Sequence, residues 1–262
     1  MKSLTRNIIF SFCLLMTFSS LKGEIIEIKH MNEIHPYVQP NTFIVFDLDN
    51  TLIEPTQELG TDQWFYYQFL KYQKDGMPVA QSLDKALAEW HAIQLLSPVK
   101  IVEQGSAEII KALQKQNFPM IGLTTRGLVL SYCSVDQLRS VNVDLALTAP
   151  CQNEVFFKSG KHYVLFHEGT LFTNGSHKGT AFCTFLEKSG YLPKHVLFIN
   201  DKASHIREIE TACGERNISF TGLRYGYLDE KVASFQEKVA ELQFEQFGKF
   251  LTNEDAHQLL NN

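Results

Sequence analysis

The sequence has no excess of basic residues. Its 262 residues include 24 Lys and Arg against 29 Asp and Glu, which gives a formal net charge of −5 at pH 7. An acidic surface repels nucleic-acid backbones, and no basic stripe interrupts this one. Internal repeats and low-complexity tracts are also absent. We therefore expect a globular protein with no nucleic-acid polymer among its partners.

Cysteine is scarce, and no two of the five cysteines form a CxxC pair, so zinc is not expected. Four of them follow the N-terminal segment: Cys133, Cys151, Cys183 and Cys213. In an exported protein four cysteines can form two disulfides or remain as free thiols. Their spacing does not choose between these outcomes, so the pairing stays open.

Residues 1–23 have the three-part layout of a secretory signal peptide. Two basic residues precede a mostly apolar run over 8–18, and small residues follow it. We expect cleavage after Ser20 or Gly23, which leaves a domain over 24–262 that is periplasmic or secreted. A membrane anchor is the alternative, but the run is too short to span about 30 Å of hydrocarbon at about 1.5 Å per residue. No stable membrane anchor is expected after cleavage.

Apolar strand patterns alternate with amphipathic helix patterns along most of the remaining chain. The strand patterns lie at 43–46, 119–123, 143–148, 196–199 and 218–223, and the helix patterns at 106–115, 128–140, 179–188 and 202–212. This alternation predicts an α/β fold with a doubly wound parallel sheet. In such sheets ligands bind beyond the carboxyl ends of the strands.

An insert after the first strand pattern is predicted to be a small helical cap. It covers about residues 55–100 and contains helix patterns at 61–75 and 82–96. Aromatic residues at helical spacing are more often core than ligand contacts, although those of the cap could also meet a substrate. The residues concerned are Trp64, Tyr66, Tyr67 and Trp90.

A second insert precedes Lys178. Short apolar runs between Val155 and Thr173 are separated by turn residues, which predicts a β-hairpin or meander and a flap beside the site. The tail over 229–260 has a mostly helical pattern and carries no recognisable chemistry.

Two carboxylates follow the first strand pattern directly. Asp47 and Asp49 occupy a predicted turn that continues through Thr51. Carboxylates two residues apart can hold a cation between them and present one oxygen to an electrophile, although such residues can also merely cap a turn. The pattern of an apolar strand followed by D-x-D-x-T-L resembles the first motif of the haloacid dehalogenase superfamily. The resemblance extends over about residues 42–225.

This resemblance implies a role for each residue of the first motif. Asp47 matches the nucleophile that forms an aspartyl-phosphate. Asp49 matches the residue that protonates the leaving oxygen and then activates water, while its backbone carbonyl ligates a magnesium ion. Thr51 would brace the turn. Dehalogenating members of the superfamily lack the second acid, so Asp49 favours a phosphatase.

Two later motifs match in the expected order. Thr124 ends a strand and matches the hydroxyl that binds the phosphoryl group. Thr125 and Arg126 match substrate-binding positions, although Arg126 could instead brace the loop. Lys178 begins a helix and matches the lysine that neutralises Asp47 and the phosphate. Each residue alone is more often structural, so the inference depends on their order.

The fourth motif is an apolar strand that ends in Asp201, which matches a magnesium ligand shared with Asp47 and Asp49. Members of the superfamily usually carry a second acid nearby, whereas here Asn200 precedes Asp201 and His205 stands four residues later. Magnesium keeps waters and takes a phosphate oxygen, so it needs few protein ligands. The missing acid predicts weaker metal binding than usual.

Together the motifs imply an exported, Mg²⁺-dependent phosphomonoesterase that acts on a small phosphorylated substrate. The chain looks like a bacterial family of exported haloacid dehalogenase-like proteins without assigned function. One alternative is a catalytically weak or inactive protein of this fold that binds a phosphorylated ligand or a protein partner. Another is phosphoryl transfer to an acceptor other than water. Substrate identity and oligomeric state do not follow from the sequence.

Overall fold

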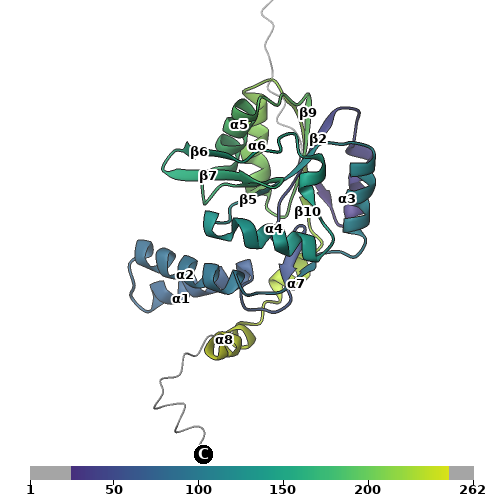
Figure 1. Ribbon diagram of the computed structural model, residues 1–262. Coiled ribbons are helices and arrows are strands. Elements are labelled where there is room, and N and C mark those ends of the chain that lie inside the picture. Colours follow the sequence, from purple (N-terminus) through teal and green to yellow (C-terminus); the bar gives the residue numbers. More distant parts are fainter. Residues whose placement is uncertain (1–24, 248–262) are drawn as a thin grey trace, which may run out of the picture.

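A mainly parallel eight-stranded sheet forms the centre of the computed structural model, which describes residues 25–247 (Figure 1). Its order is β1-β10-β9-β2-β5-β8-β7-β6. Neighbouring strands run parallel from β1 to β8 in this order, and β7 and β6 are antiparallel. The strands are β1 (Ile26–Ile28), β2 (Thr42–Phe46), β5 (Met120–Thr124), β6 (Val155–Ser159), β7 (His162–His167), β8 (Thr170–Phe172), β9 (His195–Asn200) and β10 (Ser219–Tyr225). The predicted α/β fold is confirmed.

The central strand β2 shows why the sheet is covered on both faces. All five of its residues are buried, because Phe43 and Val45 point into one core cluster while Ile44 and Phe46 point into another. The first cluster lies under α5 (Lys178–Ser189) and α6 (Ala203–Gly214). The second lies under α3 (Ser106–Lys115), α4 (Ser131–Ser140) and the 3-10 helix η1 (Met31–Tyr37). A continuous apolar strand is the expected pattern when helices cover both faces.

The predicted helical cap is present after β2. A two-stranded antiparallel pair, β3 (Ile53–Pro55) and β4 (Val99–Ile101), leads into and out of helices α1 (Asp62–Lys74) and α2 (Val79–Gln94). The tail contributes α7 (Asp229–Ala233) and α8 (Glu237–Gln246), and α8 packs on α1 (Figure 1). The rings of Trp64 and Phe244 lie 5.3 Å apart at this contact. The tail therefore completes the core of the cap.

One strand prediction is wrong. The segment 143–148 forms the 3-10 helix η3 (Leu145–Thr148), because the Asp144 side chain accepts a hydrogen bond from the Ala146 amide and begins a helical turn there. The strand that pairs with β5 on its outer side is β8, and Gly122 of β5 lies opposite Thr170 of β8. The predicted 128–140 helix is confirmed as the 3-10 helix η2 (Leu128–Leu130) followed by α4.

The insert before Lys178 supplies strands to the central sheet. β6 and β7 form the predicted hairpin, and β7 pairs with β8, so the hairpin continues the central sheet to its edge. A separate flap over the site is therefore not formed by these strands.

All four cysteines in the described part of the chain are free, and Cys183 and Cys213 are buried in the core beneath α5 and α6. Of the two open alternatives, the structure has free thiols.

No helix between residues 25 and 247 has the length and apolar character needed to cross a bilayer. The predicted signal peptide and the last part of the tail lie outside the described residues.

Candidate active site

The candidate site begins where three neighbouring strands end. Asp47 follows β2, Thr124 ends β5, and Asp201 follows β9. β2 lies between β9 and β5, so these three residues meet at one edge of the sheet. The Asp47 amide donates a hydrogen bond to the carbonyl of Ile199 at 2.9 Å, which carries the pairing of β2 with β9 into the turn.

The turn after β2 has a conformation that suits its sequence. Asn50 has φ of 57°, a left-handed value that Asn tolerates better than most residues. The Thr51 hydroxyl accepts a hydrogen bond from the Asp201 amide at 3.2 Å. Thr51 therefore joins the first motif to the fourth.

Asp47 faces a buried lysine. Lys178 is 1% exposed, and its Nζ lies 2.8 Å from Asp47 Oδ1, which also accepts from the Leu48 amide at 2.9 Å. A buried ammonium is costly unless it is paired, and Asp47 supplies that pairing. The two residues that the sequence assigned to nucleophile and neutralising cation are therefore in direct contact.

The helix that carries Lys178 lies very close to α6. A Cβ added at Gly179 would lie 2.3 Å from the carbonyl oxygen of Glu208, so a side chain at this position does not fit. The Lys178 amide donates to Glu208 Oε2 at 2.6 Å. This contact holds the first turn of α5, which carries Lys178, against α6.

Asp201 has a carboxylate oxygen without a partner. Its Oδ1 is buried and makes no hydrogen bond to any residue within 25–247, and burial together with the nearby charge of Asp47 raises the pKa of Asp201 to about 7. An unpartnered oxygen beside a second carboxylate suits a cation. No three His, Cys, Asp or Glu side chains between residues 25 and 247 are grouped to hold a metal. The two carboxylates fit Mg²⁺, which takes its remaining ligands from backbone, water and substrate.

Arg126 is fully engaged with protein groups. It is 2% exposed, and its guanidinium binds both oxygens of Asp49, with Nη2–Oδ1 at 2.7 Å and Nε–Oδ2 at 2.9 Å. Nη1 donates to Ser134 and Gln137, and Nη2 also donates to Gln94 at the end of α2. Of the two roles open for Arg126, these contacts match bracing of the loop. Each of its three side-chain nitrogens therefore already donates to a protein oxygen.

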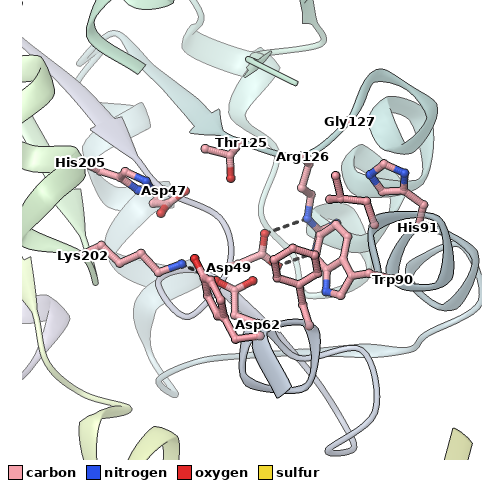
Figure 2. Close-up of a pocket in the computed structure, with 13 residues that line it drawn as sticks. Asp47, Asp49, Asp62, Trp90, His91, Thr125, Arg126, Gly127, Lys202 and His205 are labelled. Carbon is pink, nitrogen blue, oxygen red and sulfur yellow. Dashed lines mark hydrogen bonds and ion pairs between the residues drawn. The ribbon is translucent and has the colours of Figure 1, made fainter. Parts of the chain in front are cut away.

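The two adjacent threonines differ in exposure. Thr124 is 1% exposed, and its hydroxyl accepts a hydrogen bond from the Arg126 amide at 3.1 Å. Thr125 is exposed and lines the pocket next to Asp47 (Figure 2). The sequence prediction that Thr124 contacts the phosphoryl group stays a prediction, and Thr125 is the hydroxyl that faces the pocket.

A pocket of about 200 Å³ lies between the strand ends and the cap (Figure 2). The sheet side contributes Asp47, Asp49, Thr125, Arg126, Gly127, Lys202 and His205, and the cap contributes Asp62, Phe65, Tyr66, Leu87, Trp90 and His91. Of the four cap aromatics weighed from the sequence, Tyr66 and Trp90 line the pocket. Trp64 is instead fully buried in the cap core, and the Tyr67 hydroxyl donates to Glu241 on α8.

An ion pair that the sequence analysis did not identify joins the cap to the sheet. Lys202 Nζ lies 2.5 Å from Asp62 Oδ2 at the start of α1. Although burial opposes it, the charges of Asp62 and Asp201 raise the pKa of Lys202, so this side chain stays charged. Asp62 and Lys202 are 140 residues apart in the sequence. Asp62 belongs to none of the four motifs, so no local pattern predicts this contact.

His205 also belongs to the pocket. It stands four residues after Asp201, where the fourth motif of the haloacid dehalogenase superfamily usually has an acid, and that offset from Asp201 is the signal that could have identified it. Burial and the charge of Lys178 lower the pKa of His205 to about 4. The imidazole is therefore neutral at pH 7, and His205 does not supply the missing negative charge.

A family described as "Protein of unknown function (DUF2608)" matches residues 27–257. The chain belongs to this family. A Chlamydia pneumoniae protein, provisionally named as an outer membrane protein, is 26% identical to this DUF2608 protein over 239 residues, which cover 90% of each chain. An uncharacterised protein of Rickettsia prowazekii is 20% identical over an alignment of 276 positions, which covers 100% of both chains.

Solved structures with a similar fold include haloacid dehalogenase-like proteins. One is a hydrolase from Streptococcus pneumoniae, with a TM-score of 0.45, 12% identity, and coverage of 85% of this chain and 99% of that one. Another is a Bacteroides thetaiotaomicron enzyme in complex with magnesium and inorganic phosphate, with a TM-score of 0.38, 13% identity, and coverage of 69% and 93%.

Proposed function

We propose that this protein is an exported, Mg²⁺-dependent phosphomonoesterase that acts through an aspartyl-phosphate at Asp47. The observation that carries the proposal is the contact between Asp47 and the buried Lys178, next to the unpartnered oxygen of Asp201. A carboxylate can attack an anionic phosphate only when nearby cations offset both negative charges. Lys178 supplies one such charge.

Hydrolysis would proceed in two steps. Asp47 Oδ attacks phosphorus, the bond from phosphorus to the ester oxygen breaks, and the departing oxygen takes a proton from Asp49. Asp49 then removes a proton from water, which attacks phosphorus and releases inorganic phosphate with Asp47 restored. Lys178 and a hydroxyl from Thr125 or Thr124 would stabilise the equatorial oxygens.

Asp47, Asp201 and the backbone carbonyl of Asp49 would hold the magnesium ion. When bound, the ion would supply positive charge to the phosphoryl oxygens as they pass through the transition state. Asn200 would not replace the missing acid, because its Oδ1 already accepts a hydrogen bond from the Lys202 amide at 2.7 Å.

Release of phosphate from p-nitrophenyl phosphate, with Mg²⁺ and with EDTA, tests the proposal. We expect turnover that requires Mg²⁺ and is lost in Asp47→Asn, with the circular dichroism spectrum of the variant unchanged. Turnover retained in Asp47→Asn would overturn the assignment of the nucleophile. Product that forms only with added alcohol would show transfer to an acceptor instead of hydrolysis.

A protein of this fold that binds a phosphorylated ligand without turnover is the second candidate. The neutral residues Asn200 and His205 near Asp201 favour it, because they leave the cation with less negative charge than a second acid would provide. Calorimetric binding of inorganic phosphate in the presence of Mg²⁺, combined with no hydrolysis of any ester, would support this candidate against the first.

Export is part of the proposal. The relatives provisionally named as outer membrane proteins support an envelope location, together with the signal-peptide layout of residues 1–23. Mass spectrometry of the protein recovered from the periplasm or medium should give an N-terminus after Ser20 or Gly23. Recovery of only the uncleaved chain from the cytoplasm would contradict export.

A further inference from the structure

We propose that the leaving group of the substrate carries a flat, uncharged ring, which binds against the aromatic side of the pocket. This inference rests on the proposed function, and it concerns the part of the substrate that is released with the ester oxygen. The observations that support it are a row of rings on the cap, the pairing of the charged groups, and the size of the cavity.

Four rings from α1 and α2 line the cap side of the pocket and follow one another in a row. Figure 2 labels two of them, Trp90 and His91. The ring centroids of Tyr66 and Phe65 lie 5.2 Å apart, those of Phe65 and Trp90 6.4 Å apart, and those of Trp90 and His91 5.8 Å apart. Successive rings are inclined by 67°, 69° and 59°. Inclined rings at these separations present faces and edges against which a further flat ring can pack.

The rings of this row differ in how much of their surface is exposed to water. Trp90 is 6% exposed and packs in the cap core, whereas Tyr66, which also lines the pocket, is 51% exposed. Phe65 lies between them and is half-buried. An incoming ring would therefore meet Tyr66 and Phe65 and would cover apolar surface that water now contacts.

The charged side chains that line the pocket are already paired with one another or with Lys178. Asp49 pairs with Arg126 at 2.7 Å, Asp62 with Lys202 at 2.5 Å, and Asp47 with Lys178 at 2.8 Å. Among the described residues that line the pocket, no additional Lys or Arg is available to meet a second anionic group. A leaving group with its own phosphate or carboxylate would lose hydration without gaining a partner.

The cavity suits a single ring. Its volume is about 200 Å³, and an apolar cavity of about 150 Å³ is known to accommodate benzene. A flat ring on a short linker could be contributed by an aryl or benzyl phosphate or by the base of a nucleoside monophosphate. These sources share the same ring contact and differ in size.

A matched pair of esters tests the inference without a difference in leaving-group chemistry. Benzyl phosphate and cyclohexylmethyl phosphate both release a primary alcohol, but only the first has a flat ring. With Mg²⁺ present, we expect kcat/KM for benzyl phosphate to be on the order of tenfold higher, as a favourable aromatic contact would give. A nucleoside 5′-monophosphate and 4-carboxybenzyl phosphate test the larger ring source and the added charge, and we expect the carboxylate to lower kcat/KM.

Variants at Tyr66 locate the contact. Tyr66→Ala should lower kcat/KM for benzyl phosphate by about tenfold, and should lower kcat/KM for glycerol 2-phosphate, which has no ring, by a smaller factor. Tyr66→Phe should restore the benzyl preference, because it keeps the ring. Tyr163→Ala on β7 is the matched control, since Tyr163 is 50% exposed and does not line the pocket.

The outcomes separate this inference from the proposed function. Equal kcat/KM for benzyl and cyclohexylmethyl phosphate would overturn the ring contact while leaving a phosphatase in place. A benzyl preference that survives Tyr66→Ala and Phe65→Ala together would also overturn it. Absence of Asp47-dependent hydrolysis of every ester would instead reject the phosphatase proposal itself.

Discussion

Arg126 and Asp49 form a two-point ion pair in which a nearly fully buried guanidinium binds both oxygens of the proposed acid and base. The same guanidinium reaches Gln94 on the cap helix α2 and Gln137 on α4. Arg126 therefore orients Asp49 and is itself held by side chains from both the cap and α4.

Replacing Arg126 by Lys should destabilise the protein strongly. A lysine cannot reproduce the planar fork, so Asp49 and the neighbouring amides lose hydrogen bonds in a buried place. We expect a loss of about 1–3 kcal/mol in the free energy of unfolding, as for buried groups left without a hydrogen-bond partner, measured by urea denaturation. Arg139→Lys, in a half-exposed pair with Glu168, is the control and should change stability by less than about 1 kcal/mol.

An equal midpoint for Arg126→Lys and the unaltered protein would contradict this account. The same physics applies to Asp49→Asn, which leaves the charge of Arg126 buried without a counter-ion. Its loss of phosphatase activity must therefore be compared with its loss of stability before Asp49 is assigned as the proton donor.

Substitutions of Thr124 and Thr125 should affect different properties, namely stability for Thr124 and activity for Thr125. Thr125→Val removes an exposed hydroxyl from the pocket, so kcat/KM for phosphate esters should fall by about tenfold or more, as when one stabilising donor is lost. Thr124→Val leaves the Arg126 amide without its acceptor, which should cost about 1–3 kcal/mol of stability. Steady-state kinetics measure kcat/KM of both variants, and urea denaturation measures their free energy of unfolding. Loss of activity in a stable Thr124→Val protein, with Thr125→Val unaffected, would favour the original assignment of Thr124.

Gly179→Ala should move Lys178 away from Asp47. The added methyl group would meet the Glu208 carbonyl at 2.3 Å, so α5 must shift from α6, at a cost of about 1–3 kcal/mol for overpacking. Phosphate release should fall together with the melting temperature. Gly214→Ala is the control, because nothing lies within 4 Å of the added atom. Comparable stability and activity in the two variants would rule out the proposed close contact.

Stability should fall as the pH drops below about 6.5, the pKa of an unperturbed histidine. Burial lowers the pKa of His195, whose ring nitrogens lie 2.8 Å from Thr42 Oγ1 and 3.0 Å from Thr221 Oγ1. His205 has its pKa lowered to about 4. Asp201 opposes this effect, because its raised pKa of about 7 lets the folded protein keep a proton there, but the two histidines together outweigh this single group. The unfolded chain therefore binds more protons than the folded protein between about pH 6.5 and 4, so acid favours unfolding.

Urea denaturation at a series of pH values from 7.5 to 4.5 measures this dependence. His195→Gln should reduce the slope of the unfolding free energy against pH in that window. His35→Gln, at an exposed position on η1, should leave the slope unchanged. A slope that is identical in the unaltered protein and in His195→Gln would contradict the assignment.

Most of the framework follows from local patterns in the chain. Apolar runs such as 43–46 specify buried strands, and residues after parallel strands gather at one edge, so the order of Asp47, Thr124 and Asp201 was enough to predict their meeting. The approach of Lys178 to Asp47 was instead implied by the resemblance of the motifs to the haloacid dehalogenase superfamily. These relationships depend on the topology of the sheet, which the alternation of strands and helices encodes.

Long-range packing decided the rest. The apolar pattern of 143–148 is compatible with a strand, but Asp144 starts a 3-10 turn there and β8 pairs with β5. Arg126 became a partner of Asp49 because Ser134, Gln137 and Gln94 surround it in three dimensions. Which threonine faces the pocket, and which cap rings line it, likewise depend on how α1 and α2 dock over the strand ends. Local patterns specify which segments are buried, whereas side-chain partners distant in sequence are set only when those segments pack together.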